Sequence, residues 1–500
     1  MLKKIATNTI SQIFSKVATA IISIVLIGLL IRYFSVEMYG MYTKIYNYLL
    51  IFAFLVDLGL YTITIREISQ NKNETEKIIW NILTLRVLSG AIVIFMALII
   101  AYFLPWYNST LAFFSIFIVS IFTIIWLINS TLLSLMQAYM KIEFSMISAI
   151  LWKLLNLFLI FLIIKYFFIF PEWTSDSAFF APFLWILWAW IFWIILNTFL
   201  NFFYANKIAK IRFRFDKDYL KYILKISIPY WIAIFLWVVY LKIDVILLSV
   251  LEPIWQADKS VALYSLPIKI IEVIMMLWAF FLNSVLPLLT ENFKQKNFKK
   301  YEEIILNSFK VLFAFWVWVL SLWLLFRDYL IRIIAWDSAS KYLSNEINRY
   351  TSSDAFVIVL FVLLFYFISL LFTYILISTE KQSKLLKINI IVTVINIVWN
   401  LIFIPKYSFI WAWIVTVFSQ VLLLFLWYFY TKDLVKINFP IKYIFWILIL
   451  GFFIFAFWTF LTTKYSIWLY LDVLLYWWAL FGIYSFIIFK ILTYKKNKYN

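Results

Sequence analysis

Charged side chains interrupt several of the long apolar runs in this sequence. Lys242 and Asp244 lie in one run and Lys269 and Glu272 in the next, within residues 230–291, which read as two membrane-spanning helices joined by a polar turn. A charge at the centre of a bilayer costs roughly 2.5–3.5 kcal/mol, so such residues usually face a cavity or a partner. A chain that keeps several of them is predicted to build a polar path through the membrane.

Bases inside the apolar runs are the candidate groups for binding an anion. They are Lys16, Lys44, Arg86, Lys242 and Lys269. An anionic head group that moves through hydrocarbon needs cations to replace its lost hydration, and ammonium and guanidinium groups supply charge-assisted hydrogen bonds. We predict that these five side chains line a cationic cleft. The alternative for Lys16, Lys44 and Lys269 is that the ammonium snorkels to water near a helix end.

Three acids, Asp57, Asp244 and Glu272, complete the candidate site. Lys269 and Glu272 are three residues apart and can pair on one helix face, whereas Lys242 and Asp244 are two apart and point to different faces. Asp57 has no charged neighbour within four residues of sequence. It is predicted either to bind a coupling proton or sodium ion or to form a salt bridge with a lysine of a neighbouring helix. No other cofactor and no metal centre is expected.

The composition is typical of an all-α polytopic membrane protein. Of the 500 residues, 66% are hydrophobic and 13% are charged, against about half and about a quarter in soluble domains. Cysteine and histidine are absent, which excludes disulfides, thiolate or imidazole metal sites, and catalysis by Cys–His or Ser–His pairs. The chain is therefore not expected to be an enzyme. The net charge of +19 comes without a basic, aromatic-rich patch on a soluble face, so nucleic acid is not an expected partner.

About fourteen transmembrane helices are predicted, because apolar runs of membrane-spanning length recur along the whole chain. They lie near 10–32, 41–65, 80–104, 110–136, 145–169, 180–204, 226–250, 262–287, 305–326, 355–378, 386–405, 409–430, 441–462 and 466–489. The termini and the connections on their side hold 27 of the 43 Lys and Arg, and the opposite connections hold nine. Positive charge gathers on the cytoplasmic side, so both termini are predicted to be cytoplasmic.

An internal repeat divides the predicted spans into two pseudo-symmetric lobes. The pattern Ser-Val-x-x-Tyr, with a lysine five residues after the tyrosine, occurs at residues 35–44 and again at 260–269. Six spans separate the copies, so both enter the membrane in the same direction, as parallel repeats do. The predicted domains are an N-terminal six-helix lobe at 1–206, a basic cytoplasmic linker at 207–225, a C-terminal six-helix lobe at 226–432, and two extra helices with a basic tail at 433–500.

Short segments spread over spans one to twelve resemble those of a transporter family. They are 34–40, 57–61, 262–265 with Lys269 and Glu272, 283–288, and 404–407 followed by Ala412 and Thr416. Their order and spacing resemble the O-antigen type flippases of the polysaccharide biosynthesis family. These oligosaccharidyl-lipid flippases belong to the MATE-like multidrug/oligosaccharidyl-lipid/polysaccharide (MOP) superfamily. The resemblance implies two six-helix bundles around a central cleft, with two further C-terminal helices.

The resemblance also implies a function. It implies a flippase that moves an undecaprenyl-pyrophosphate-linked oligosaccharide across the bacterial cytoplasmic membrane by alternating access, for polysaccharide or O-antigen biosynthesis. The implied partners are this lipid-linked sugar, membrane lipids and the glycan polymerase machinery. A lipid II flippase and a multidrug or cation antiporter of the same fold stay open as alternatives, although bases outnumber acids within the spans. An integral-membrane glycan polymerase or ligase is the alternative from another class, disfavoured by the short 327–354 connection and the absence of histidine.

The chain departs from the resemblance in its glycine and tryptophan usage. It has 26 Trp and 6 Gly, whereas glycine averages about 7% of residues. Trp316, Trp318, Trp411 and Trp413 stand within spans, where close helix crossings favour small residues. Our hypothesis is that many of the Trp positions are UGA codons that the organism reads as glycine. The alternative is a genuinely aromatic sequence.

Overall fold

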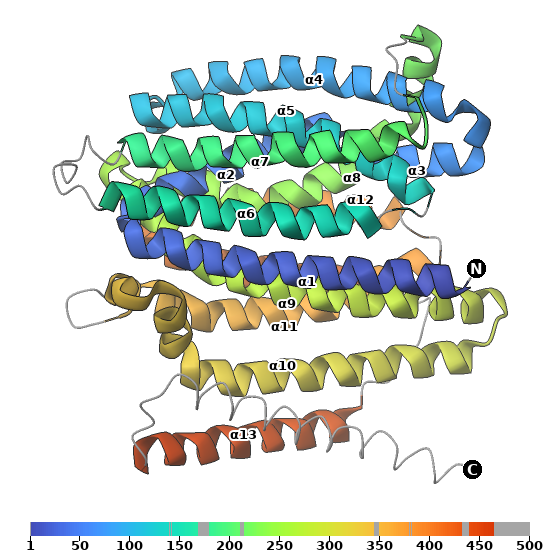
Figure 1. The fold of residues 1–500 in the computed structure, drawn as a ribbon. Coiled ribbons are helices and arrows are strands. Elements are labelled where there is room, and N and C mark those ends of the chain that lie inside the picture. Colours follow the sequence, from blue (N-terminus) through green and yellow to red (C-terminus); the bar gives the residue numbers. More distant parts are fainter. Residues whose placement is uncertain are drawn as a thin grey trace. The chain divides into compact units, whose positions relative to one another are not determined.

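The computed structural model is built of α-helices joined by short turns and 3₁₀ segments, as the composition predicts (Figure 1). It describes residues 2–139, 141, 143–168, 180–210, 215–344, 350–379, 381, 383–432 and 440–464. Among these residues, ten helices are long and apolar enough to cross a membrane. The chain is therefore a polytopic α-helical membrane protein.

The helices follow one another along the chain with short connections. They are α1 (Leu2–Tyr33), α2 (Val36–Asp57), α3 (Leu60–Gln70), η1 (Lys72–Glu74), α4 (Thr75–Phe103), η2 (Pro105–Tyr107), α5 (Thr110–Ala138), α6 (Glu143–Phe168), α7 (Phe180–Asn206), α8 (Lys217–Leu251), α9 (Ile254–Lys294), α10 (Phe298–Ala335), η4 (Trp336–Lys341), α11 (Ser352–Ser378), α12 (Ser383–Thr431) and α13 (Ile441–Lys464). Thirteen of the fourteen predicted spans fall on these helices. The predicted span at 466–489 lies outside the described residues.

Helix α12 carries two of the predicted spans, 386–405 and 409–430. Pro405 lies inside it, and Ser408 has a non-helical backbone with φ 61° and ψ −157°. Proline cannot donate the backbone hydrogen bond that a continuous helix requires, so the chain changes direction here. The two predicted spans are therefore confirmed as two helical segments on either side of Ser408.

The predicted span at 41–65 is wrong in one respect, because it is broken. α2 ends at Asp57 and α3 begins at Leu60. Leu58 and Gly59 between them have φ values of 51° and 65°, a left-handed conformation that glycine adopts readily. A leucine in this conformation costs about 1–3 kcal/mol unless its surroundings fix it.

The basic connection at 207–225 also differs from expectation, because α8 begins within it, at Lys217.

The chain packs as two compact units. Unit 1 comprises Met1–Ser265 and Ile397–Phe409, and unit 2 comprises Leu266–Asn396 and Ile410–Asn500. Helices α9 and α12 therefore contribute segments to both units. The predicted division into lobes at 1–206 and 226–432 stays a prediction.

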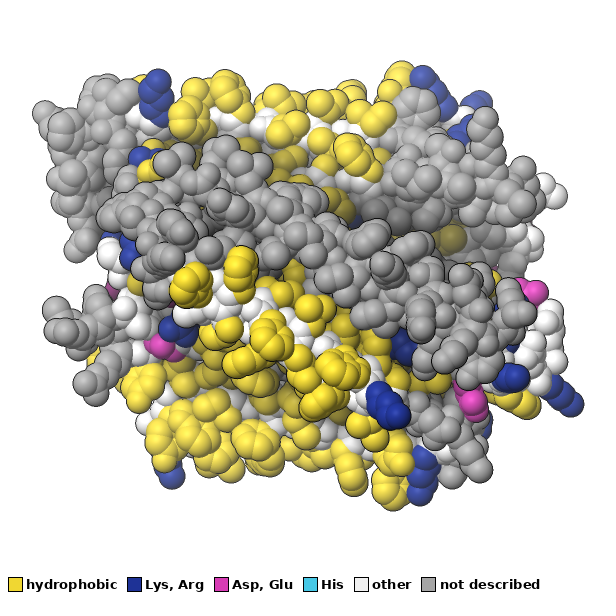
Figure 2. Space-filling model, turned by 90° about the horizontal axis from the view of Figure 1, so that it is seen from below, with side chains coloured by type: hydrophobic (Ala, Val, Ile, Leu, Met, Phe, Trp, Pro, Cys, Tyr) yellow, Lys and Arg dark blue, Asp and Glu magenta, His cyan; other side chains and the backbone are white. Residues whose placement is uncertain are grey.

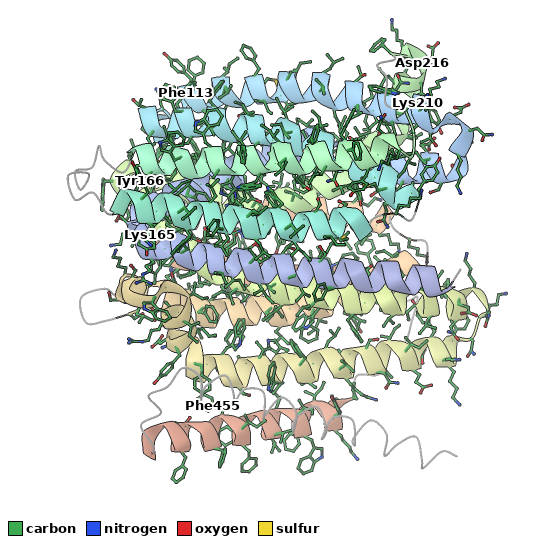
Figure 3. The ribbon with its side chains drawn as sticks, in the orientation of Figure 1. Phe113, Lys165, Tyr166, Lys210, Asp216 and Phe455 are labelled. Carbon is green, nitrogen blue, oxygen red and sulfur yellow. The ribbon has the colours of Figure 1, made fainter. Side chains whose placement is uncertain are left out.

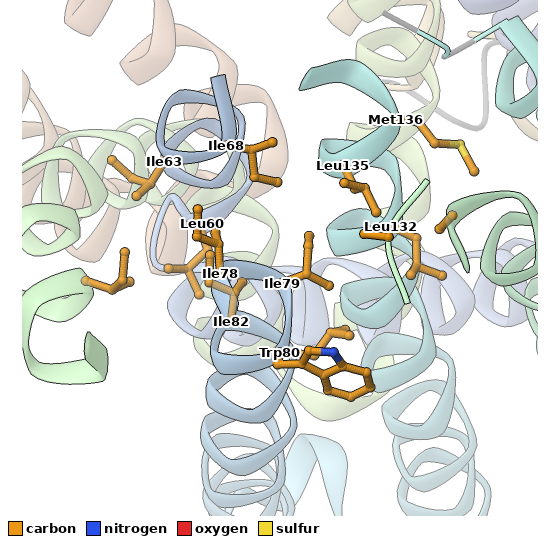
Figure 4. Close-up of a cluster of buried hydrophobic side chains, with 14 residues drawn as sticks. Leu60, Ile63, Ile68, Ile78, Ile79, Trp80, Ile82, Leu132, Leu135 and Met136 are labelled. Carbon is orange, nitrogen blue, oxygen red and sulfur yellow. The ribbon is translucent and has the colours of Figure 1, made fainter. Parts of the chain in front are cut away.

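At one end of unit 1, hydrophobic side chains from α3, α4, α5 and α8 meet in a buried cluster (Figure 4). Ile68, Ile79, Leu135 and Ile223 are fully buried in it, and the Trp80 indole donates a hydrogen bond to the Lys210 carbonyl at 3.3 Å. The cluster and this hydrogen bond hold residues 209–210 against α4. Unit 1 is therefore firmly packed at the end that carries the predicted basic linker.

The outer face of α4 shows the pattern that a lipid environment requires. Leu88, Ile92, Phe95, Ile99 and Phe103 recur at helical spacing and are between 42% and 75% exposed. A continuous apolar stripe of this kind on the surface of a soluble protein would mark an interface. Figure 2 shows hydrophobic side chains over much of the described part of another face, with Lys and Arg mainly toward its margins.

In unit 2, α10 packs against α11 and α13. The Ser321 hydroxyl donates to the Gly451 carbonyl at 3.1 Å, and a Cβ atom at Gly451 would lie 2.4 Å from Val317 Cγ1. Glycine therefore allows α13 to approach α10 closely. On the other side, the Trp316 indole donates to the Leu360 carbonyl of α11 at 3.0 Å.

Candidate functional site

The break between α2 and α3 holds a buried ion pair. Arg86 of α4 is only 1% exposed, and its guanidinium contacts the Asp57 carboxylate. The same guanidinium donates to the Leu127 carbonyl at 2.9 Å and to the Thr131 hydroxyl at 2.8 Å, both on α5. Asp57 therefore has the salt bridge predicted as its alternative role, but its partner is an arginine. The pair joins three helices at the point where one of them is interrupted.

A second buried carboxylate, Asp244 of α8, accepts hydrogen bonds from a phenol and an amide. It is 2% exposed. The Tyr264 hydroxyl donates to one carboxylate oxygen at 2.7 Å, and the Asn400 amide donates to the other at 2.9 Å. These residues come from α8, α9 and α12 and all lie in unit 1. A carboxylate with amide and phenol oxygens around it has the donor chemistry that binds a sodium ion or a proton.

Lys44 of α2 is buried at the opposite end of unit 1 from the cluster of Figure 4. It is 3% exposed, and its Nζ atom lies 2.5 Å from a carboxylate oxygen of Asp258, at the start of α9. The ammonium also donates to the Trp106 carbonyl at 3.0 Å and lies 5.2 Å from the centre of the Tyr107 ring. The predicted alternative of snorkelling to water does not describe this buried, paired side chain.

The remaining predicted site residues occupy three other places. Lys269 and Glu272 of unit 2 form the predicted i, i+3 pair, with Nζ 3.2 Å from a carboxylate oxygen. Lys242 is half-buried on α8, and Lys16 is exposed on α1. Four of the five predicted bases thus lie in unit 1 and one in unit 2.

Sequence reasoning missed Asp258 and Asn400. Asp258 lies in the polar turn predicted between the two helices of residues 230–291, where an acidic residue is not unusual. Asn400 carries no charge and therefore does not stand out inside an apolar run. Uncharged polar groups inside a membrane also need partners, so Asn400 could have been marked as a polar residue within an apolar run. Its partner could not, because Asp244 lies 156 positions away in the sequence.

The two ends of unit 1 are distinct in the side-chain view. Figure 3 shows Lys210 and Asp216 at one end, and Phe113, Lys165 and Tyr166 at the other. At the first end Lys77 pairs with Asp216 at 2.8 Å. That ion pair lowers the pKa of the Asp216 carboxyl, with the Lys77 hydrogen bond as the largest cause. Both side chains are partly exposed, so this pair is a surface feature.

Two family models match the sequence. A model described as "Polysaccharide biosynthesis protein" matches residues 5–293, which is more than half of the chain, and a model described as "MatE" matches residues 229–402. No curated protein sequence matches significantly.

Several solved structures share the fold at low sequence identity. A structure titled "Lipid II flippase MurJ, inward closed conformation" is 16% identical, covers 98% of this chain and 100% of its own, and has a TM-score of 0.70. An inward-facing multidrug resistance MATE family transporter of the MOP superfamily is 13% identical, covers 84% and 93%, and has a TM-score of 0.63. A MOP superfamily transporter from Pyrococcus furiosus is 13% identical, covers 84% and 95%, and has a TM-score of 0.53.

These structures establish the fold, and the match to the family model establishes family membership. The solved structures with this fold are named as a flippase and as transporters. The chain belongs to the polysaccharide biosynthesis protein family and is a membrane transporter with the MOP superfamily fold.

Proposed function

We propose that this transporter moves an undecaprenyl-pyrophosphate-linked oligosaccharide from the inner to the outer leaflet of the bacterial cytoplasmic membrane. The observation that carries the proposal is the match of residues 5–293 to the polysaccharide biosynthesis family. The similarity over 98% of the chain to a structure titled as a lipid II flippase adds support, because lipid II is also a lipid-linked sugar.

The intramembrane charges fit an anionic head group. A pyrophosphate gives up strong hydration when it leaves water, and ammonium groups replace part of it with charge-assisted hydrogen bonds. Lys16, Lys242 and Lys269 are the bases proposed to meet the head group directly. Lys44 and Arg86 are proposed to contribute to the positive field while holding Asp258 and Asp57.

We assign the coupling-ion role to Asp244. Asp244 is 2% exposed, and its two carboxylate oxygens accept hydrogen bonds from the Tyr264 phenol and the Asn400 amide. A cation that binds there adds a positive charge to a buried carboxylate and thereby changes the balance between conformations. Sodium and protons are the two candidate ions.

The charge distribution supports a proposed orientation in the membrane, and family membership supports a proposed partner. Both termini and the basic connections are proposed to lie in the cytoplasm. The glycan that reaches the outer leaflet is the substrate of a polymerase, so contact with the glycan polymerase machinery is part of the proposal.

The test is translocation by the purified protein in liposomes. Three substrates are compared: an undecaprenyl-pyrophosphate-linked oligosaccharide, lipid II, and a cationic dye with an imposed sodium or proton gradient. The proposal expects the lipid-linked oligosaccharide to become accessible on the far side at a protein-dependent rate. Movement of lipid II alone would support the lipid II flippase, and movement of the dye alone would support the antiporter.

Charge-neutral variants connect that assay to the proposed site. Lys242→Gln and Lys269→Gln are each expected to lower the translocation rate about ten-fold or more, since a hydrogen bond to a charged group contributes about 1.5–3 kcal/mol. Lys217→Gln is the matched control, because Lys217 is exposed at the start of α8. Full activity of both variants would remove these lysines from the site.

A further inference from the structure

One end of unit 1 is closed by contacts between segments that lie far apart in the sequence. On one side are the first turns of α2 and the short helix η2. On the other side are the last turn of α8 and the start of α9. In the predicted topology, the connections next to these segments are the ones placed outside the cytoplasm.

The closest approach between the two sides is at Gly40. A Cβ atom at this position would lie 1.7 Å from the carbonyl oxygen of Asp258 and 2.5 Å from its carbonyl carbon. Any residue other than glycine would therefore push α2 away from the start of α9. This glycine is used for contact rather than for an unusual backbone angle, because it lies within α2.

Lys44 lies one helical turn after Gly40, on the same face of α2. Its ion pair with Asp258 therefore fastens the segment that Gly40 touches. The Lys44 side chain is 4% exposed and that of Asp258 is 26% exposed. The pair is thus buried at its Lys44 end and partly exposed at its Asp258 end, although the Asp258 oxygen that contacts Lys44 is itself buried.

The helix η2 adds two hydrogen bonds across the same boundary. The Trp106 indole donates to the Glu252 carbonyl at 3.0 Å, and the Tyr107 and Ser249 hydroxyls are 2.7 Å apart. Because the Trp106 carbonyl also accepts from Lys44, the hydrogen bonds and the ion pair form one connected group. Breaking the ion pair would leave the ammonium of Lys44 buried, so the contacts are expected to open together.

We propose that Gly40, Lys44, Trp106, Tyr107, Ser249, Glu252 and Asp258 form a latch that shuts the outer end of the transport path. This outer latch rests on the proposed function, since it must open for the lipid-linked sugar to reach the outer leaflet. It joins residues that the predicted lobes at 1–206 and 226–432 hold separately. Movement of one lobe against the other would therefore have to break it.

The test measures how fast the latch opens. The chain has no cysteine, so Ser260→Cys introduces a single thiol at a position that is 2% exposed, two residues after Asp258. Its reaction with a membrane-impermeant maleimide added outside intact cells reports opening. Lys44→Gln and Asp258→Asn are expected to raise the labelling rate about ten-fold or more, because each leaves one charge buried without its partner. Gly40→Ala is expected to raise it as well, by wedging α2 away from α9.

Matched variants separate latch opening from general damage. Gly90→Ala adds the same methyl group where its nearest neighbours are 3.7 and 3.9 Å away, and Lys77→Gln removes the ion pair at the opposite end. Both are expected to label at the rate of the parent. The double variant Lys44→Asp with Asp258→Lys restores an opposite-charge pair, so its labelling should fall back toward the parent, which an unfolded protein would not do.

The latch and the proposed function can fail separately. Parental labelling of Lys44→Gln, Asp258→Asn and Gly40→Ala, or no recovery in the charge-swapped variant, would overturn the latch. The labelling needs no substrate, so altered labelling in a protein that moves no lipid-linked sugar in liposomes would reject the proposed substrate while keeping the latch.

Discussion

The guanidinium of Arg86 holds the carboxylate of Asp57 at the residue where α2 ends, two positions before Gly59 carries the chain into α3. The ion pair therefore lies at the point where the helix is broken. The broken helix exposes backbone groups that a continuous helix would bond internally, and the charged pair stands beside them. A membrane protein keeps such an arrangement when neighbouring helices fix it, and Arg86 is fixed by Leu127 and Thr131 of α5.

Removing one partner of this pair should destabilise the fold. Asp57→Asn leaves the Arg86 charge buried, and Arg86→Gln leaves the carboxylate without its counter-ion, so each is expected to lower the free energy of unfolding by about 3–5 kcal/mol. Denaturation of the purified protein in detergent measures this. The double variant should lose less than the sum of the two, since it contains no unmatched charge. Strictly additive losses would show that the pair is not coupled.

Substitution of Asp244 should change ion coupling without unfolding the protein. Asp244→Asn keeps an acceptor for Tyr264 but loses the charge that attracts a cation. Translocation in liposomes should then become insensitive to an imposed sodium or proton gradient. Tyr264→Phe removes one hydrogen bond and keeps the charge, so its gradient dependence should remain. Unchanged gradient dependence in Asp244→Asn would move the coupling site elsewhere.

The outer latch should be tighter at acidic pH because of Glu252. Burial raises the pKa of the Glu252 carboxyl, and hydrogen bonds from Ser408 and Ser260 offset this only in part. In the open latch the carboxyl is hydrated and returns to its ordinary pKa, so the closed latch binds the proton more strongly. Closure is therefore favoured as pH falls through the raised pKa and weakened as pH rises through it. Lys44, Asp258 and Glu37 are charged groups at the same end, and burial also raises the pKa of the Asp258 carboxyl, so this second acid acts in the same direction.

The measurement for Glu252 is the labelling rate of Ser260→Cys between about pH 7 and about pH 5. The thiol itself reacts more slowly in acid, so the rate is compared with the same reporter in Glu252→Gln. The parent should slow more than the variant as pH falls. Equal slowing in both proteins would contradict a role for this carboxyl.

The tryptophan hypothesis makes a prediction about the mature protein. Among the described residues, the buried indole nitrogens of Trp152, Trp190, Trp193, Trp323 and Trp427 have no hydrogen-bond partner, although buried indoles usually find one. Glycine at such positions would leave no orphan donor and would let helices approach closely. Peptide mass spectrometry is expected to find glycine at several Trp positions whose codons are TGA. Tryptophan at all of them, or TGG codons, would end the hypothesis.

Much of the fold could be predicted because the bilayer imposes simple rules on sequence. Apolar length places the helices, and the family resemblance rests on short segments in the right order. The break after Asp57 was missed because Leu58 and Gly59 continue an apolar run, and only their backbone angles reveal the interruption. The interruption of α12 was predicted, because Pro405 marks it in the sequence between the two predicted spans.

Less of the site could be predicted, because tertiary structure decides which residue each charged side chain pairs with. The pairing of Lys269 with Glu272 follows from helical spacing, so the sequence was sufficient there. The pairing of Lys44 with Asp258 joins residues more than two hundred positions apart. Nothing local in either segment indicates it, and the charge of Asp258 lies in a turn where acidic residues are ordinary.

The central claim is that intramembrane bases carry an anionic, lipid-linked sugar across the membrane. The most direct measurement compares, in the same liposomes, translocation of an undecaprenyl-pyrophosphate-linked oligosaccharide with that of an uncharged analogue carrying the same sugar and tail. The wild-type protein is predicted to move the pyrophosphate-linked sugar at least about ten-fold faster, and Lys242→Gln with Lys269→Gln to abolish that preference. Equal rates for the two substrates in the wild type, or an undiminished preference in the double variant, would contradict the claim.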